Sequence, residues 1–287
     1  IGVNFIDTYH RTGLYPVKLP SGLGMEGAGV VEAVGEGVTR FAVGDPIAYA
    51  SGPIGAYAEF HVVAAERAVK PPAGIDARVA AAAMLQGMTV EFLVRRCYPV
   101  KAGDFVLFHA AAGGVGTIAM QWLASLGAIT IGTAGSAEKC ALAKSLGAAH
   151  VINYRTEDWV KRVKEITDGK GCHVVYDGVG KDTFMASLDC LRPRGMMATF
   201  GNASGPVPEI QPLLLSQKGS LFLTRPTLFH YIASRSDFEL SATALFDVVT
   251  RGVVKIQIGH RYPLKDAAQA HRDLEARKTT GATILLP

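Results

Sequence analysis

A glycine-rich turn is the first segment whose residue types and spacing suggest a chemistry. An apolar run at 105–109 is followed by Ala110-Ala-Ala-Gly-Gly-Val-Gly116 and then by a helix-forming run. Counted from Ala111, the turn matches A-x-G-x-x-G, a dinucleotide-binding pattern with alanine in the first glycine position. Gly113 lets the backbone approach a pyrophosphate, and Gly116 lets the helix pack closely on the strand. We therefore expect the phosphates of a dinucleotide to lie against Ala112, Gly113, Gly114 and Val115.

The end of the next strand discriminates between NAD and NADP. NAD sites place an acidic residue about 20 residues further on, at the strand tip, where it binds the ribose 2′-hydroxyl. The strand expected at 129–133 ends instead in Ala134-Gly-Ser136, and Glu138 comes later, inside the following helix. The Ser136 hydroxyl can donate to a phosphate, and Lys139 stands one turn further along. The missing acid and the nearby cation together predict a 2′-phosphate, and hence NADPH as the coenzyme.

Alternating strand and helix patterns position this turn. After the strand at 105–109 we expect helices at 114–126, 137–146 and 157–167 and a further helix ending near 191. Between them we expect strands at 129–133, 151–153, 174–177 and 196–201. Repeated βα units with short connections predict a parallel sheet covered on both faces. In the tail we expect a helix near 242–250, a strand near 254–258, a helix at 265–277 and a final strand at 282–286.

The first third of the chain has a different texture. It is rich in glycine and β-forming residues, with short alternating stretches at 27–34 and 57–63 and turns such as Gly35-Glu-Gly37 and Gly44-Asp-Pro46. This pattern predicts a barrel- or sandwich-like β domain. The fold class expected for the whole chain is therefore α/β, with a doubly wound parallel sheet and a separate β-rich domain.

Composition excludes several classes of function. The net charge of +4 comes from 29 basic and 25 acidic residues that are scattered along the chain, which argues against nucleic-acid binding. No apolar run approaches the roughly 20 residues that span a membrane. The four cysteines form no C-x-x-C pair, as expected for a cytosolic protein with reduced thiols. Neither H-E-x-x-H nor G-x-S-x-G occurs, and His109, at a strand end, is expected to pack rather than react. The chain opens at Ile1 inside an apolar run, so we expect a segment to precede it.

The run from Gly24 to Val38 carries a family resemblance. Gly24, Glu26, Gly29, Gly35 and Val38 fit the pattern G-H-E-x2-G-x5-G-x2-V, the hallmark that this run resembles in the medium-chain dehydrogenases/reductases. Met25 stands where the zinc-dependent members have a zinc-binding histidine, and their structural-zinc cysteine cluster is missing. The chain is thus similar to the zinc-free quinone oxidoreductase (zeta-crystallin-like) branch, and we expect no catalytic metal.

The resemblance covers the whole visible chain, including Asn4 to Tyr9, Gly87 to Thr89 and Phe200 to Asn202. It implies a Rossmann NADPH-binding domain at 88–226. It also implies a GroES-like catalytic domain formed by 1–87 and 227–287, with its N-terminal part missing, and an active cleft between the two domains.

Site residues follow from the same resemblance. It implies that Asn4, Asp7 and Tyr9 lie at the nicotinamide end with Thr89 near the carboxamide, and Asn4, Tyr9 and Thr89 are the candidate catalytic residues. Asn4, Tyr9 and Tyr49 would contact the acceptor substrate. The remaining implied coenzyme contacts are Gly135, Ser136, Lys139 and Tyr154 at the 2′-phosphate, Phe200, Gly201 and Asn202 at the middle of the coenzyme, and Arg277 from the last helix. Taken singly, each has an ordinary alternative, such as a turn cap, a half-buried aromatic or a helix C-terminal cation.

The implied reaction is reduction of a quinone by NADPH. Two alternatives stay open: an NADPH-dependent reductase of α,β-unsaturated aldehydes or ketones, and a non-catalytic protein that binds NADPH or nucleic acid. The apolar segment Ser220 to Pro226 is expected to be the last strand of the parallel sheet, on an open edge. The resemblance implies a homodimer that pairs residues 220–224 across a two-fold axis, with Leu221 and Leu223 on one face of the strand and Phe222 on the other.

Overall fold

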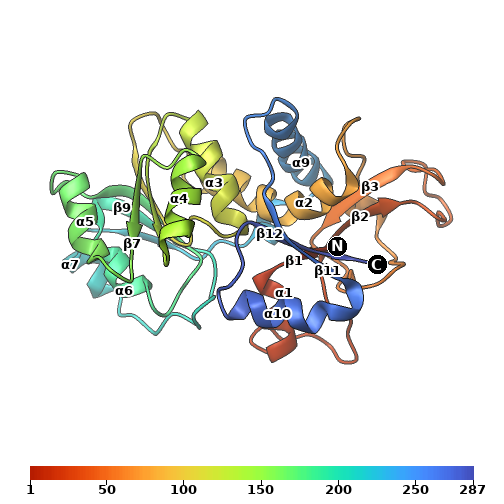
Figure 1. The fold of residues 1–287 in the computed structure, drawn as a ribbon, viewed down its shortest axis with the longest axis horizontal. Helices are drawn as coiled ribbons and strands as arrows, with labels where there is room; N and C mark the ends of the chain where they lie inside the picture. The colour runs from red at the N-terminus through yellow and green to blue at the C-terminus, as the bar shows by residue number, and fades with distance from the viewer. The chain divides into compact units, whose positions relative to one another are not determined.

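The computed structural model describes residues 1–287 and divides into two compact units. Unit 1 comprises Ile1–Thr89 and Phe229–Pro287, and unit 2 comprises Val90–Leu228. Helix α2 (Ala77–Phe92) and the π-helical segment η2 (Leu93–Cys97) lead the chain from the first unit into the second (Figure 1).

Unit 2 is built on a six-stranded sheet in which every pair of neighbours is parallel. The strand order is β10-β9-β8-β5-β6-β7, so the chain starts in the middle at β5 and its direction of growth reverses between β5 and β8. This is the order of the doubly wound dinucleotide-binding fold, and it confirms the parallel sheet expected from the sequence. The strands are β5 (Phe105–Phe108), β6 (Ile129–Ala134), β7 (His150–Asn153), β8 (Cys172–Asp177), β9 (Leu191–Thr199) and β10 (Phe222–Thr224).

Helices cover both faces of this sheet because its central strands, such as β5 (FVLF), are apolar on both faces. Leu107 and Val175 belong to a buried cluster to which three helices contribute Val163, Phe184 and Leu214. Neighbouring strand residues point to the opposite face, and helices α3 and α4 also pack against β6. The helices are α3 (Gly114–Ser125), α4 (Ala137–Ser145), α5 (Trp159–Ile166), α6 (Phe184–Leu188) and α7 (Leu213–Gln217) (Figure 1).

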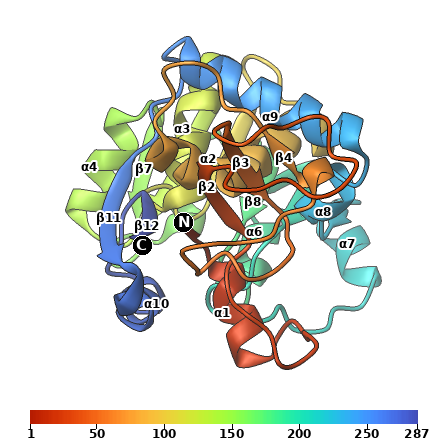
Figure 2. The same cartoon turned by 90° about the vertical axis from the view of Figure 1, so that its right-hand side faces the viewer.

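Unit 1 contains two three-stranded sheets. Strands β2 (Glu26–Val30), β3 (Pro46–Ala50) and β4 (Ala68–Val69) form an antiparallel sheet. In the other sheet, β12 (Ala282–Leu286) lies between β1 (Gly2–Val3), which is antiparallel to it, and β11 (Ile258–Pro263), which is parallel to it (Figure 2). The last strand of the chain therefore ties the first residues into unit 1.

Helices complete unit 1. Helix α1 (Phe5–Thr12) follows β1 directly and contacts α10 (Ala267–Glu275), which comes from the C-terminal part of the chain. The other elements are η1 (Ala65–Arg67), α8 (Leu228–Tyr231), α9 (Arg235–Thr250) and η3 (Leu264–Asp266).

Two expected strands are wrong. Residues 57–63 form no strand, because the Tyr57 N–H donates to the Leu23 carbonyl and holds the chain against an irregular segment. The strand expected at 254–258 starts only at Ile258, since the Val254 N–H donates to the Val248 carbonyl and closes the end of α9. In both segments the apolar pattern is real, but the backbone hydrogen bonds go to another part of the chain.

Other boundaries differ from expectation. Strand β9 begins at Leu191 and ends at Thr199, so the helix before it is confined to Phe184–Leu188. Helix α10 ends at Glu275, and Arg277 has a left-handed backbone conformation (φ +59°) that terminates the helix.

Strand β10 is an edge strand, as expected, but it is shorter than 220–224. Phe222, Leu223 and Thr224 pair with β9. Leu221 precedes the strand and is buried in the core at 7% exposure, whereas Phe222 is 59% and Leu223 36% exposed. The apolar edge therefore consists of Phe222 and Leu223 alone.

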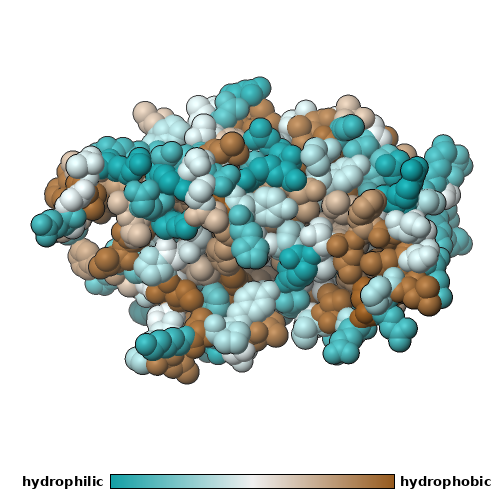
Figure 3. All heavy atoms as spheres, turned by 180° about the vertical axis from the view of Figure 1, so that it is seen from behind, coloured by the Kyte–Doolittle hydropathy of each residue, from teal (hydrophilic) through white to brown (hydrophobic).

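One helical stretch, Ala77–Cys97, is long and apolar enough to cross a membrane. Its most apolar window is 78% buried inside the protein, which is the usual state of a core helix. On the face of the molecule drawn in Figure 3, hydrophobic residues are interspersed with hydrophilic ones. Neither observation favours a membrane-spanning role.

The close packing of α3 on the turn after β5 yields a first prediction. A Cβ added at Gly116 would lie 2.6 Å from the Ala111 carbonyl carbon and would also overlap the Ala110 oxygen. Because these are backbone atoms that cannot move aside cheaply, Gly116→Ala should destabilise the protein by about 1–3 kcal/mol. Urea unfolding measures the effect. Gly29→Ala is the control, since no atom lies within 4 Å of its added Cβ, and an equal loss in the two variants would contradict the packing argument.

Candidate functional site

The glycine turn lies at the carboxyl end of β5. Ala110 has a φ of +55°, and the Ala111 N–H donates to the Thr133 carbonyl of the neighbouring strand β6. Gly113 is the N-cap of α3, so the turn ends in the first residues of a twelve-residue helix. The first N–H groups of a helix have no partner within the helix and attract anions. Ala112, Gly113, Gly114 and Val115 thus lie at the N-terminus of α3, where a helix attracts anions.

A second group of predicted residues gathers beyond β6. Ser136 is the N-cap of α4, and its hydroxyl oxygen accepts a hydrogen bond from the Lys139 N–H at 3.3 Å. The Tyr154 N–H donates to the Ala134 carbonyl, and the Tyr154 ring covers Gly135 so closely that an added Cβ would lie 2.7 Å from the ring carbon Cζ. Gly135, Ser136, Lys139 and Tyr154 therefore form one small corner that combines a helix N-terminus, a hydroxyl and a cation.

Glu138 also belongs to this corner, although it lies inside helix α4 and not at the tip of β6. The side chain is fully exposed, and a hydrogen bond with the Ser136 side chain holds the pKa of its carboxyl below the usual value. A phosphate bound in this corner would replace the carboxylate as the partner of Ser136.

The loops after β8 and β9 hold each other. The Asp177 carboxylate accepts hydrogen bonds from the Val179 N–H (2.7 Å) and the Thr183 hydroxyl (2.8 Å), which fixes the loop after β8. The Phe200 N–H donates to the Asp177 carbonyl at 2.8 Å. Phe200, Gly201 and Asn202 consequently leave β9 at the same sheet edge as the glycine turn, because the carboxyl ends of parallel strands share one edge.

His109 lies in the core of unit 2 as expected. Its two ring nitrogens are bonded to the hydroxyls of Thr133 and Ser187, each at 2.9 Å, and Trp159 packs edge-on against the ring. Burial lowers the pKa of His109. A neutral histidine with both nitrogens occupied has a structural role.

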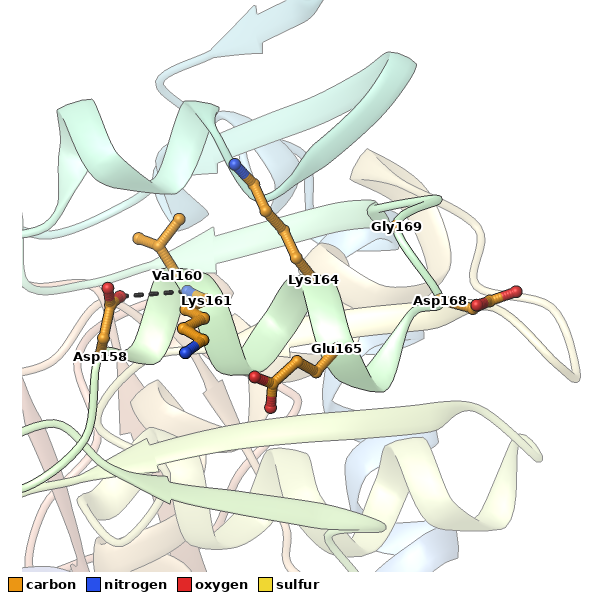
Figure 4. A pocket seen from close by; sticks show the side chains of 7 residues that line it. All are labelled: Asp158, Val160, Lys161, Lys164, Glu165, Asp168 and Gly169. Atoms are coloured by element: carbon orange, nitrogen blue, oxygen red, sulfur yellow. Dashed lines mark hydrogen bonds between the residues drawn. The ribbon is translucent and has the colours of Figure 1, made fainter.

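Two surface hollows contain none of the predicted site residues. The first, of about 530 Å³, follows α5, and Figure 4 shows its charged side chains spread along the helix surface. The second, of about 790 Å³, lies in unit 1. Its Lys70 and Arg235 are paired with Asp45 and Glu239. Neither resembles a coenzyme site.

In unit 1, Asn4 is engaged on both sides of its amide. Its Nδ2 donates to Glu26 Oε2 at 2.7 Å, and its Oδ1 accepts from Gln86 Nε2 at 3.1 Å. Glu26 is fully buried and also accepts from the Leu85 N–H at 2.7 Å. Burial raises the pKa of Glu26 to about 8. Asn4 therefore keeps one N–H hydrogen for a ligand.

Asp7 is joined to the same network. Its Oδ2 accepts from the Asn4 backbone N–H at 2.8 Å and from the Tyr57 hydroxyl at 2.9 Å. The residue is fully buried, and burial raises its pKa to about 7. Its other oxygen, Oδ1, is buried without a hydrogen-bond partner. Since buried polar atoms nearly always have partners, this oxygen suits a donor group from a bound molecule.

The remaining predicted residues of unit 1 are less closely linked. Tyr9 is 8% exposed and packs edge-on against Tyr15, and the Thr89 hydroxyl donates to the Leu85 carbonyl at 2.7 Å. The Tyr49 hydroxyl pairs with His61 at 3.0 Å, and burial raises the pKa of Tyr49 to about 12. Asn4 and Asp7 are thus brought together directly, and Tyr9 joins them through helix α1.

Comparison with known proteins identifies this architecture. Residues 1–73 match the alcohol dehydrogenase GroES-like domain, and residues 114–247 match the zinc-binding dehydrogenase family. Over its whole length the chain is 56% identical to a quinone oxidoreductase of Pseudomonas aeruginosa, of which it covers 89%. The chain belongs to the quinone oxidoreductase family of medium-chain dehydrogenases/reductases.

Members of this family include solved structures that the chain resembles throughout. The Escherichia coli quinone oxidoreductase complexed with NADPH is 51% identical, with a TM-score of 0.98, and is covered to 89% by the whole of this chain. A 2-haloacrylate reductase of a Burkholderia species is 47% identical, with all of this chain matching 88% of that protein. The quinone oxidoreductase family thus contains enzymes named for different acceptors.

The zinc-dependent relatives differ from this quinone oxidoreductase family member at one position of the hallmark. Met25, in the place of the zinc-binding histidine, is buried at 7% exposure. No group of three or more His, Cys, Asp or Glu side chains in the structure could hold a metal ion.

Sequence reasoning missed several members of the network in unit 1. Glu26 belongs to the hallmark, so its position was a usable signal. Tyr57 and His271 are 214 residues apart and bonded at 2.9 Å, and no local pattern marks either one. Gln86 and Asp177 were likewise not singled out as site residues, although each is buried and holds a predicted residue or loop in place.

The raised pKa of Glu26 predicts a pH-dependent stability. Between the ordinary pKa of 4.5 and the folded value of about 8, the native state binds the proton that the unfolded chain has lost. The contribution of Glu26 is therefore complete below pH 4.5 and falls as the pH rises through 8, by up to about 1.4 kcal/mol per pH unit. Glu26→Gln should reduce this slope between pH 5 and 8 in urea unfolding, leaving the part that comes from Asp7. The exposed Glu32→Gln should keep it, and identical slopes in all three proteins would refute the assignment.

Proposed function

We propose that this protein is a cytosolic NADPH-dependent quinone reductase that works without zinc. The observation that carries the proposal is the full-length identity of 51–56% to quinone oxidoreductases, one of them solved with NADPH. The corner formed by Gly135, Ser136, Lys139 and Tyr154 supports NADPH, since the Ser136 hydroxyl and Lys139 can bind a 2′-phosphate there and the nearby Glu138 stands in helix α4 rather than at the strand tip, where NAD sites place their carboxylate. The absence of disulfides among the four cysteines supports the cytosol.

The proposed division of labour follows the two units. We assign coenzyme binding to residues 88–226 and catalysis to 1–87 with 227–287, and the bounds of the two compact units lie close to these limits. In this assignment Ala112 to Val115 bind the pyrophosphate and Phe200 to Asn202 border the middle of the coenzyme, and Arg277 is a further proposed contact.

The chemistry explains how a metal can be dispensed with. NADPH supplies a hydride, and a quinone accepts it readily because reduction makes the ring aromatic and leaves a stabilised phenolate. The protein then needs only to orient the acceptor and exclude water. The free N–H hydrogen of Asn4 and the Tyr9 hydroxyl are the proposed contacts to the acceptor oxygen, with Thr89 nearby and Tyr49 lining the pocket.

A second candidate is reduction of an activated carbon–carbon double bond. The observation favouring it is the 47% identity to a 2-haloacrylate reductase. An enone or haloacrylate also accepts hydride at carbon and places negative charge on an oxygen, so the same N–H and O–H donors would serve. The shape of the pocket decides between the two substrate classes.

Steady-state kinetics test the choice. With NADPH we expect kcat/KM to be highest for 1,4-benzoquinone or 9,10-phenanthrenequinone and at least about tenfold lower for a simple enone and for 2-chloroacrylate, a difference of roughly 1.4 kcal/mol in the activation free energy. A preference for either unsaturated carbonyl compound would favour the second candidate. Tight NADPH binding with no turnover of any acceptor would favour a non-catalytic binding protein.

Lys139 tests the coenzyme site. Lys139→Ala should raise the KM for NADPH roughly ten- to a hundredfold, because a charge-assisted contact to the 2′-phosphate is lost. The KM for NADH should hardly change, since NADH has no such phosphate. Lys161→Ala, on the exposed surface of α5, is the control for the loss of one positive charge. Equal effects on the two coenzymes would show that Lys139 does not bind the phosphate.

We propose, in addition, that two copies associate through the edge strand β10. The exposed Phe222 and Leu223 support this, because an uncovered apolar strand edge favours pairing with another chain. A two-fold axis beside β10 would extend the parallel sheets of both copies into one.

The oligomeric state of variants tests this interface. Phe222→Asp and Leu223→Asp should convert a dimer to monomers in light scattering, because a charge near a two-fold axis meets its own copy. Leu221 is unsuitable, since it is buried in the core of unit 2 and a charge there would unfold the protein. Leu240→Asp, on the exposed side of α9, is the control. A monomeric native protein, or variants that stay dimeric, would rule the interface out.

A further inference from the structure

Four side chains from distant parts of unit 1 form a continuous hydrogen-bonded chain. Arg11 Nη1 contacts His271 Nδ1 at 2.9 Å, His271 Nε2 contacts the Tyr57 hydroxyl at 2.9 Å, and this hydroxyl contacts Asp7 Oδ2 at 2.9 Å. Asp7 is fully buried and His271 is 2% exposed, whereas the Arg11 side chain is 37% exposed and pairs with Glu275 at 2.6 Å. This series of hydrogen bonds therefore leads from the surface ion pair of Arg11 and Glu275 to the buried carboxyl of Asp7.

The direction of every hydrogen bond in this chain follows from Arg11. A guanidinium group can only donate, so His271 Nδ1 must accept. A neutral imidazole has a single N–H, which is then on Nε2 and donates to the Tyr57 oxygen. Tyr57 must in turn donate its own hydrogen to Asp7 Oδ2. Burial and the charge of Arg11 lower the pKa of His271, which keeps the ring neutral, and burial raises the pKa of Tyr57.

Close packing holds Tyr57 in this role. Gly24, the first residue of the hallmark, has a φ of +88°, and an added Cβ would lie 2.7 Å from ring carbon Cε1 of Tyr57. The Tyr57 ring also meets the His271 ring edge-on, at 85° between the ring planes. The hydroxyl is thus fixed in direction by its neighbours.

Asp7 is left with one satisfied oxygen and one unsatisfied oxygen. Oδ2 accepts from Tyr57 and from the Asn4 backbone N–H, and Oδ1 is buried without a partner. While Asp7 is ionised, Oδ1 is an acceptor. Oδ2 already faces two donors and cannot carry a proton without losing one of these bonds. When Asp7 binds a proton, the proton therefore goes to Oδ1 and turns it into a donor.

We propose that Arg11, His271 and Tyr57 are positioning residues for the coenzyme site, which direct a hydrogen bond into Asp7 Oδ2 so that Oδ1 stays an ionised acceptor for an N–H or O–H group on the nicotinamide half of NADPH. This inference rests on the proposed function. Both the carboxamide and the ribose of that half present neutral donors, and either one satisfies Oδ1. None of the three residues has to touch the coenzyme.

The consequence is a pH-dependent affinity. Burial holds the pKa of Asp7 near 7, while Tyr57 and the Asn4 N–H lower it. The other charged or titratable groups around these hydrogen-bonded side chains are Glu26, Arg11, His271 and Glu275. NADPH should therefore bind more weakly as the pH falls through about 7. Removing the Tyr57 hydroxyl takes away one of the influences that keep Asp7 ionised.

Binding of NADPH to the substrate-free protein, followed by fluorescence between pH 5.5 and 9, tests this. In Tyr57→Phe the midpoint of the affinity change should move upward by about 1–2 pH units, as expected for loss of one hydrogen bond to a charged group. In Asp7→Asn the NADPH affinity should no longer fall as the pH drops through about 7, because the titrating carboxyl has been removed. Tyr262→Phe is the matched control, because the Tyr262 hydroxyl donates to a different carboxylate, Asp273, at 3.0 Å in the same unit. Titration of the 2′-phosphate of NADPH affects binding equally in all four proteins, so it does not alter the comparison between them.

The outcomes distinguish failure of this inference from failure of the proposed function. A midpoint in Tyr57→Phe equal to those of the unmodified protein and Tyr262→Phe would overturn the inference, whereas failure of the unmodified protein to bind NADPH at any pH would overturn the proposed function instead. Should Tyr57→Phe not fold, nitrogen NMR of His271 in the unmodified protein decides. The Nε2–H tautomer is expected, with Nδ1–H gaining population in Arg11→Gln, and a Nδ1–H tautomer in the unmodified protein would contradict the direction of the chain.

Discussion

Two carboxyl groups that are removed from water, those of Asp7 and Glu26, constrain the packing of unit 1. A buried carboxyl is costly unless hydrogen-bond donors replace the lost water. Here the donors are the Asn4 amide and backbone, the Leu85 backbone and the Tyr57 hydroxyl. These groups come from the start of α1, from the middle of α2 and from the loop after β3. Satisfying the two carboxyls therefore ties α1 and α2 to β2 through Glu26 and ties the loop after β3 to α1 through Asp7.

Unit 2 depends on a different constraint, the parallel direction of its strands. Since all six strands point the same way, every loop that leaves a strand end reaches the same edge of the sheet. The glycine turn, the Ser136 corner and the Phe200 loop therefore all lie at one edge of the sheet. The Asp177 carboxylate then fixes the loop after β8 at this edge.

The two units differ in how their polar groups are engaged. In unit 2 the Ser136 hydroxyl and Lys139 lie together at the start of α4, and no acid stands at the tip of β6. In unit 1 most polar groups are already bonded to one another, and Asn4 retains a single hydrogen. Relatives of similar sequence are named for a quinone or for a haloacrylate as the acceptor.

The sequence by itself determined the parallel sheet, the glycine turn and the NADPH-type corner, because each depends on residues close together in the chain. Gly113, Gly116 and Ser136 act through the strand and helix that they join, and local pattern is sufficient to find them. Only the tertiary structure decided the rest. The alternation at 57–63 suggested a strand, but the Tyr57 backbone bonds to Leu23 and its hydroxyl lies between Asp7 and His271. A side-chain hydrogen bond between residues 214 positions apart leaves no periodic trace in the chain, so the arrangement around Asp7 became visible only once the fold had brought those residues together.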